Sequence, residues 1–270
     1  IIISTGNFFN LKPGNKLLQC LPSNFIAGKM MIVRAIILGL ELDMVEPSVL
    51  PRIDYEKDYD FCAFTPMQLK SFAKYLKSIK TVIVGGGRVS NTIIDLIKDK
   101  KPHVYETYGM TETYSHIAYR RLDSDYFYPL ATVDLDVNEE SCLKIKCALT
   151  EGKWLQTSDV VAFKNGGFKI LGRNDHVINS GGLKLHPEVM EAEILADNPY
   201  AYHSFFIGSI KDSVLGEKGV LVKKRGLELS LSPSSNLKYI KMTVEVDCLQ
   251  FTATEKIDRR RSMKEAGLDL

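Results

Sequence analysis

The sequence predicts an α/β protein in which parallel βαβ layers and an antiparallel β region precede a small α+β domain. Three observations predict this fold class. Strand and helix signals alternate up to about residue 130, hydrophobic alternation around a hairpin turn follows, and strands around one helix return beyond residue 172. With 270 residues, the chain is long enough for about two domains.

The first predicted elements form a βαβ unit. Residues 67–79 carry apolar side chains at helical spacing, which favours an amphipathic helix, and residues 81–84 are typical of a short buried strand. Ser90 is a predicted N-cap for a second helix. Residues 103–106 form the next predicted strand, which runs into a loop at 107–112. Strand, helix and strand in this order indicate parallel pairing.

Antiparallel pairing is predicted after residue 130, because Leu143, Ile145 and Cys147 alternate with polar residues. The Asn165–Gly167 turn favours a hairpin. Farther along, Pro187 opens a predicted helix. The remaining predicted elements are strands at 203–210, 219–223 and 242–247 and a loop at 224–237.

Composition excludes several classes of protein. Apolar residues make up 45% of the chain and charged residues 25%, which excludes disorder and collagen. The net charge of +2 gives no overall attraction to nucleic acid, and the apolar stretch 30–40 is too short to span a membrane. Five cysteines without metal-ligand spacing favour reduced, mostly buried thiols in a cytoplasmic protein.

Two glycine-containing segments follow predicted strands. Gly85–Gly87 lacks the spaced third glycine of a dinucleotide loop, so a plain strand-to-helix turn is the better interpretation of it alone. Tyr108–Thr113 lies where open α/β sheets bind ligands, and the Tyr108 ring can pack on a base. Thr111 can donate to a phosphate oxygen, and Glu112 can bind Mg²⁺. A polar turn with one buried aromatic ring explains this segment equally well.

Three further segments carry charged residues suited to a nucleotide. The Asp159 carboxylate could accept hydrogen bonds from two ribose hydroxyls, although Asp residues that cap turns are far commoner. Arg173 lies at the predicted domain boundary, and its planar fork suits ribose or phosphate oxygens, with a solvated linker as the alternative. Lys256 lies in a basic C-terminal run, which is usually a solvated tail.

The order of these segments resembles the adenylate-forming acyl- and aryl-CoA synthetase superfamily over nearly the whole chain. The most specific parts are 108–113 (YGMTET), 172–194 (GRNDHVINSGGLKLHPEVMEAEI) and 252–259 (TATEKIDR). Three stretches look most like o-succinylbenzoate–CoA ligases of menaquinone synthesis, namely 21–35, 60–69 and 177–185.

The resemblance also implies the domain organisation. The glycine-rich phosphate loop of the superfamily would precede residue 1, so residues 1–172 would be the truncated large adenylate-binding domain. Residues 173–270 would be a C-terminal lid domain that carries the catalytic lysine. Ser158 stands where the superfamily has the Gly of Thr-Gly-Asp, and Glu255 stands where it has the Gly before the catalytic lysine.

The resemblance implies ATP, Mg²⁺ and CoA as cofactors and assigns a role to each matching residue. Catalysis falls to Lys256, Thr111 and Glu112, with Glu112 as the metal ligand. The nucleotide-binding residues are Gly85, Gly86, Gly87, Tyr108, Gly109, Met110, Asp159 and Arg173. CoA would meet Gly181, Gly182 and Lys184, and Asp175 would be the hinge. The substrate pocket would contain Phe25, Lys29, Arg34, Ser115 and His116, although Lys29 and Arg34 could equally be helix-face charges.

The implied function is an ATP-dependent carboxylate–CoA ligase that acts through an acyl-adenylate on a small-molecule carboxylic acid, most like an o-succinylbenzoate–CoA ligase. Nucleic acid and integral membrane association are not expected. Two alternatives remain at this point. Another acyl- or aryl-CoA synthetase shares every nucleotide motif, and a non-catalytic adenylate-binding module would tolerate the missing phosphate loop.

Overall fold

The computed structural model describes residues 1–100, 102–232, 236–252 and 256–268. The chain divides into two compact units, each described here by itself. The predicted domain boundary between residues 172 and 173 stays a prediction. The first unit comprises Ile1–Asn138, Leu143–Thr157 and Ala162–Lys169, and the second comprises Glu139–Cys142, Ser158–Val161 and Ile170–Leu270.

A seven-stranded sheet forms the centre of the first unit, in the order β2-β1-β3-β4-β5-β6-β7. The first five strands of this order pair in parallel, and β6 and β7 add antiparallel neighbours at one edge. Strand β4 pairs in parallel with β5, which confirms the predicted βαβ unit. The strands are β1 Lys16–Gln19, β2 Glu41–Met44, β3 Tyr59–Phe64, β4 Ile79–Val84, β5 His103–Gly109, β6 His116–Arg121 and β7 Tyr128–Pro129.

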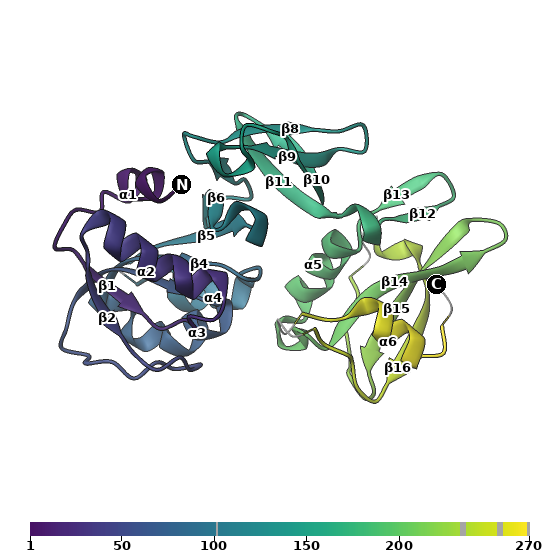
Figure 1. The fold of residues 1–270 in the computed structure, drawn as a ribbon. Helices are drawn as coiled ribbons and strands as arrows, with labels where there is room; N and C mark the ends of the chain where they lie inside the picture. The colour runs from purple at the N-terminus through teal and green to yellow at the C-terminus, as the bar shows by residue number, and fades with distance from the viewer. Residues whose placement is uncertain (101, 233–235, 253–255, 269–270) are drawn as a thin grey trace. The chain divides into compact units, whose positions relative to one another are not determined.

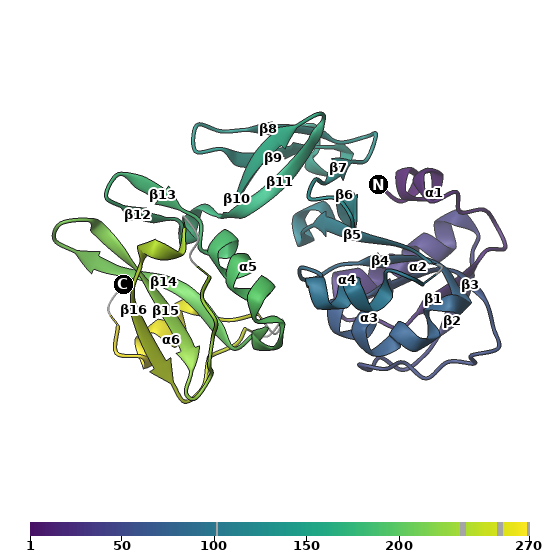
Figure 2. The same cartoon turned by 180° about the vertical axis from the view of Figure 1, so that it is seen from behind.

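Helices cover both faces of this sheet. Helix α2 lies on one face, where Met31 and Ala35 pack against Leu17 and Phe61 of the strands (Figure 1). Helices α3 and α4 lie on the opposite face, which the reverse view presents (Figure 2). The first-unit helices are α1 Ile2–Phe8, α2 Ile26–Leu38, α3 Pro66–Phe72 and α4 Asn91–Ile97.

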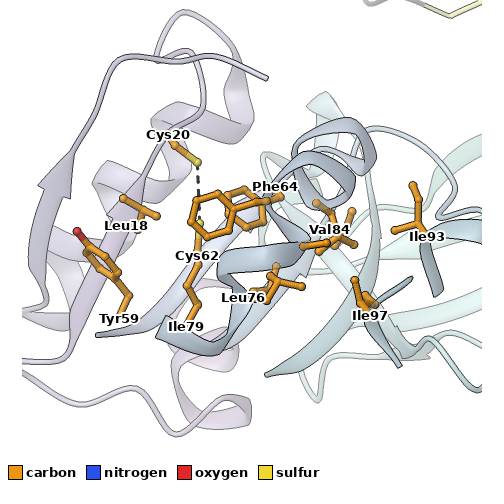
Figure 3. Close-up of a cluster of buried hydrophobic side chains, with 14 of the residues drawn as sticks. Leu18, Cys20, Tyr59, Cys62, Phe64, Leu76, Ile79, Val84, Ile93 and Ile97 are labelled. Atoms are coloured by element: carbon orange, nitrogen blue, oxygen red, sulfur yellow. Dashed lines mark hydrogen bonds between the residues drawn. The ribbon is translucent and has the colours of Figure 1, made fainter. Parts of the chain in front are cut away.

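The core under α3 and α4 is a continuous apolar cluster (Figure 3). Cys20 and Cys62 lie in it with their Sγ atoms 3.9 Å apart. Four of the five cysteines are buried, as predicted, and Cys248 is exposed. No helix in the described ranges is long and apolar enough to cross a membrane.

Several predicted boundaries were wrong, among them those of one helix and one loop in the first unit. The predicted helix over 67–79 is helix α3 followed by a tighter 3₁₀ segment, η1 Ala73–Ser78. The tighter turns bury Leu76 in the same cluster and end at Ser78, whose Oγ donates to the Tyr75 carbonyl. The predicted loop at 107–112 is also too long, because β6 pairs with β5 as far as Gly109 and so extends that strand. The Ser90 cap is confirmed by its hydrogen bond from the Ile93 amide.

Antiparallel pairing follows residue 130, as predicted. A four-stranded sheet has the order β11-β10-β9-β8. Asn165 and Gly166 both have positive φ angles, 51° and 78°, which suit a tight hairpin between β10 and β11. These strands are β8 Asp134–Val137, β9 Cys142–Lys146, β10 Leu155–Lys164 and β11 Gly167–Arg173.

The second unit is built on a five-stranded sheet in the order β13-β12-β15-β14, with β16 paired in parallel to β15. Met190 and Ile194 of α5 pack in one core cluster, and Met263 of α6 packs in another. Its strands are β12 Ile178–Ser180, β13 Leu183–Leu185, β14 Phe205–Asp212, β15 Gly216–Lys224 and β16 Ile240–Val246. Its helices are α5 Pro187–Asp197 and α6 Arg259–Glu265.

Candidate functional site

The carboxyl ends of β4 and β5 lie side by side in the first unit, because these strands are parallel neighbours. Thr107 donates from its Oγ1 to the Val84 carbonyl at 3.0 Å and fastens the two ends together. A Cβ on Gly85 would lie 3.2 Å from the same Oγ1. At Gly85, the first residue of the glycine cluster, a larger residue would therefore press against strand β5. Gly86 and Gly87, which follow it, are exposed.

Tyr108 lies one residue before the end of β5, and its half-buried ring packs edge-on against Phe168, with centroids 5.4 Å apart. At Gly109 the chain approaches the backbone of Ser115 and His116 so closely that a Cβ would overlap it. This approach explains the glycine, because the loop that follows β5 turns back directly into β6.

The loop 110–115 holds the predicted phosphate and metal residues. Thr111 and Glu112 lie exposed in a 3₁₀ turn, η2 Thr111–Thr113. Thr113 is buried, accepts a hydrogen bond from the Met110 amide at 3.1 Å and donates to the Ser115 carbonyl at 2.8 Å. Thr113 therefore orders the loop that presents Thr111 and Glu112, a role that the sequence analysis missed.

A buried ion pair that the sequence did not reveal joins the two strands on either side of this loop. Arg120 Nη2 on β6 lies 2.6 Å from Glu106 Oε2 on β5, and both side chains are less than 10% exposed. The Val89 amide also donates to Glu106 Oε2. The pair joins the two strands that enter and leave the loop.

Three of the predicted pocket residues are brought together beside this loop. Arg34 on α2 is 1% exposed, and its Nη2 lies 3.5 Å from Ser115 Oγ, which in turn lies 3.4 Å from His116 Nδ1. Arg34 Nη1 donates to Met31 Sδ at 3.0 Å. Within the described ranges Arg34 has no ion pair, and its Nε has no hydrogen-bond partner. Arg34 is thus a buried cation with no carboxylate partner among those residues, and it is not a helix-face charge.

Burial also sets the charge states of this cluster. Desolvation lowers the pKa of Arg34 to about 10, which leaves the guanidinium protonated at neutral pH. Desolvation, with the nearby Arg34 charge, lowers the pKa of His116 to about 3. His116 is therefore neutral and hydrogen-bonds with Thr5 Oγ1 at 3.1 Å. Phe25 and Lys29 lie exposed at the start of α2, and in the part of the protein that the structure describes no hydrogen bond or ion pair joins either side chain to the cluster.

The predicted ribose and hinge residues meet in the second unit. Arg173 binds Asp175 through Nε and Nη2, both at 3.0 Å, and its Nη1 lies 3.8 Å from Asp159 Oδ1. The Arg173 guanidinium holds the pKa of Asp175 below its ordinary value. Asp175 lies in a 3₁₀ turn, η4 Asn174–His176, so the segment after β11 is ordered rather than a solvated linker.

The predicted CoA-binding residues form a hairpin. Gly181 and Gly182 are the two turn residues between β12 and β13, and both have the positive φ angles, 58° and 81°, that this turn requires. Lys184 is exposed on β13. Strands β12 and β13 pair from Ile178 to Leu185, so the backbone on both sides of this turn is ordered.

Lys256 is exposed just before α6. Its amide donates to Thr252 Oγ1 at 3.2 Å, and its carbonyl accepts from the Thr252 amide at 2.8 Å. Asp258 then caps α6 by accepting from the Arg261 amide. Glu255, the departure noted beside Lys256, lies outside the described residues.

The described residues contain no cluster of three or more His, Cys, Asp or Glu side chains that could hold a metal ion. Mg²⁺ in nucleotide sites is usually bound by one or two carboxylates together with substrate phosphates. The exposed Glu112 fits that pattern, in which most of the ligands come from the nucleotide.

No protein-family model matches the chain. Among solved structures it is similar to the AMP-forming acyl-CoA synthetase/AMP-acid ligase II-like protein of Dyadobacter fermentans, with 32% identity and a TM-score of 0.64 over 98% of this chain and 82% of that one. The o-succinylbenzoate CoA synthetase (MenE) of Bacillus subtilis, solved with its acyl-adenylate intermediate, has 18% identity and a TM-score of 0.78 over 96% of this chain and 63% of that one. These likenesses confirm the predicted fold class.

A curated relative, 2-succinylbenzoate–CoA ligase of Bacillus cytotoxicus, is 23% identical over 262 residues, which cover 77% of this chain and 53% of the relative. A second one, from Bacillus cereus, is 22% identical over 266 residues, 78% of this chain and 54% of the relative. The chain thus spans about half the length of the curated relatives it matches.

Proposed function

The chain belongs to the AMP-forming acyl-CoA synthetase family, and on this basis we propose that the complete protein is an ATP-dependent carboxylate–CoA ligase. A carboxylate is a poor acyl donor because its oxygen leaves badly. Adenylation by ATP supplies a better leaving group and releases pyrophosphate. CoA then displaces AMP to give the thioester.

The proposed roles follow from charge. Attack of a carboxylate on the α-phosphate brings anions together, so a cation at the reacting atoms contributes most to catalysis. Lys256 supplies that cation, and the ordered turn after β5 presents Thr111 to the phosphate. Mg²⁺, held by Glu112 and the phosphates, would neutralise further negative charge. Asp159 and Arg173, 3.8 Å apart, bind the ribose.

The acid that we propose is a dicarboxylate of the o-succinylbenzoate type. The observation that carries this choice is Arg34, a buried guanidinium without an ion pair among the described residues. A charge that is buried without a partner is costly, and a second carboxylate on the substrate would neutralise it. Ser115 and the neutral His116 lie next to Arg34 and can donate hydrogen bonds to the same group.

A pyrophosphate-release assay over a panel of acids tests the proposal on the complete protein. The panel compares o-succinylbenzoate with benzoate and with medium-chain fatty acids. Leaving buried polar groups unpaired costs about 1–3 kcal/mol, so the monocarboxylates should be poorer substrates by roughly tenfold or more. Equal rates with a fatty acid would refute the dicarboxylate and leave the ligase. ATP binding without pyrophosphate release from any acid would refute the ligase and indicate a non-catalytic adenylate-binding module.

A further inference from the structure

Glu188, on the first turn of α5, joins two segments of the second unit that are far apart in the sequence. Its Oε1 lies 2.5 Å from His176 Nδ1 and 3.5 Å from Arg259 Nη2. A Cβ on Gly172 would overlap its Oε2. One carboxylate therefore contacts the 172–176 segment on one side and the start of α6 on the other.

Arg259 is fixed at this point by a second carboxylate. Its Nη1 and Nη2 lie 2.6 and 2.8 Å from the Glu191 oxygens, and Nη1 also donates to the Ile207 carbonyl at 2.6 Å. The Ile207 amide donates back to Glu191 Oε1 at 2.7 Å. Glu191 thereby anchors Arg259 to α5 and β14, and among the described residues no hydrogen bond or ion pair joins Glu191 to the 172–176 segment.

Arg259 follows Lys256 by three residues along an ordered backbone. The Asp258 side chain caps α6, and the Asp258 amide donates to the Gln250 carbonyl at 2.8 Å. Lys256 is hydrogen-bonded to Thr252 through both of its backbone groups. A displacement of Arg259 should therefore also displace Lys256, because the backbone between the two residues is held by these hydrogen bonds.

The 172–176 segment contains Asp175, the residue that the sequence resemblance predicts to be the hinge. Gly172 precedes this residue and His176 follows it, and Glu188 touches both. The Glu188 side chain is thus packed against the backbone on one side of Asp175 and hydrogen-bonded on the other. Glu188 Oε2 has no hydrogen-bond partner among the described residues, so its position depends on this packing.

We propose that Glu188 is a positioning residue for Lys256: it holds the hinge segment and the Lys256 segment in one arrangement through His176 and Arg259. The role in catalysis rests on the proposed function. A misplacement of about 1 Å at a reacting group costs on the order of 10²-fold in rate. The arrangement should matter for adenylation, which uses Lys256, and little for thioester formation from supplied acyl-adenylate.

The test compares Glu188→Ala with a matched control on the same helix. Glu193 accepts from Asn236 Nδ2 at 2.6 Å, so Glu193→Ala removes a different carboxylate from the same helix and controls for that loss. Both half-reactions are measured separately with the complete protein. Glu188→Ala should lower adenylation by about tenfold to hundredfold and thioester formation by less than about twofold. Glu188→Gln, which keeps an acceptor for His176, should recover part of the adenylation rate.

Hydrogen exchange gives a readout that does not need activity. In Glu188→Ala the amides of 172–176 and of 256–262 should both exchange faster, whereas Glu193→Ala should leave both unchanged. Unchanged exchange in Glu188→Ala, or an equal loss in both half-reactions, would overturn the proposal. If the wild-type protein activates no acid, the proposed function fails, and the exchange experiment still decides whether Glu188 couples the two segments.

Discussion

Replacing the buried Arg34 by methionine should strengthen the fold and weaken the enzyme at the same time. Desolvation lowers the pKa of Arg34 from its ordinary value to about 10. Each unit by which a pKa is shifted corresponds to about 1.36 kcal/mol, so burial destabilises the charged form of Arg34 by about 3 kcal/mol in the folded protein. Both the folded and the unfolded protein hold this proton at pH 7, so the whole penalty is present there. It is relieved only as the pH rises through 10.

Methionine fills a similar length of the pocket and carries no charge. The substitution removes the hydrogen bonds to Met31 and Ser115 and the contact with the Phe61 ring, whose centroid is 5.5 Å from the guanidinium carbon. Such a cation–π contact contributes about 0.5–2 kcal/mol. The free energy of unfolding should therefore rise by about 1–2 kcal/mol, which raises Tm by about 2–6 °C in a protein of this size.

Activity should move in the opposite direction. Removing one partner of a buried charge pair costs about 2–5 kcal/mol of binding, so kcat/KM for o-succinylbenzoate should fall by about 30-fold or more. The kcat/KM for benzoate should change little, because benzoate has no second carboxylate.

Differential scanning calorimetry and pyrophosphate release measure the two effects on the same preparation. Lys70→Met, at an exposed position on α3, removes a positive charge without these contacts and serves as the control. A lower Tm together with an equal loss for both acids would refute the reasoning, since Arg34 would then be a structural residue.

Three further predictions concern other parts of the chain. Lys256→Ala should lower adenylate formation by roughly 10²–10³ while sparing thioester formation from supplied acyl-adenylate, and Asp175→Pro, which fixes φ near −65°, should do the reverse in paired half-reaction assays. The unfolded protein takes up a proton at His116 near pH 6.5, whereas the folded protein does so only near pH 3, so acidification below pH 6.5 should lower the free energy of unfolding. His116→Gln should reduce that loss, which urea unfolding at pH 7 and at pH 5 measures. Arg120→Ala leaves Glu106 buried without its partner and should cost about 3–5 kcal/mol in urea unfolding, a loss that a double replacement by apolar residues of similar volume should largely avoid.

Local chemistry made part of this fold predictable from the sequence. The Ser90 cap and the Asn165–Gly166 hairpin depend on residues within three or four positions of one another, so their patterns are visible in the sequence. The end of β5 was not predictable in this way. Whether Gly109 belongs to a strand depends on the return of the chain at His116, which a local pattern does not contain.

Burial of charge was the larger difficulty. Residues 30–40 are apolar on nearly every face of α2, so the sequence did not indicate that Arg34 points into the protein while Lys29 remains exposed. The network around Glu188 was hidden for another reason. Glu188 and Arg259 are 71 residues apart, and neither neighbourhood has a pattern that indicates the other.

The way in which the chain leaves β5 and enters β6 limits how such a protein can change its substrate. Thr111 and Glu112 stand on the same short loop as Ser115, and Gly109 and Thr113 leave this loop little room to adjust. A mutation that reshapes the Ser115 side to admit another acid would also move the residues proposed to meet the phosphates. Helix α2 carries no residue proposed to bind the phosphates, because it belongs to a separate part of the chain. Substitutions that change the acid specificity should therefore occur first on α2, while the sequence of the loop stays the same.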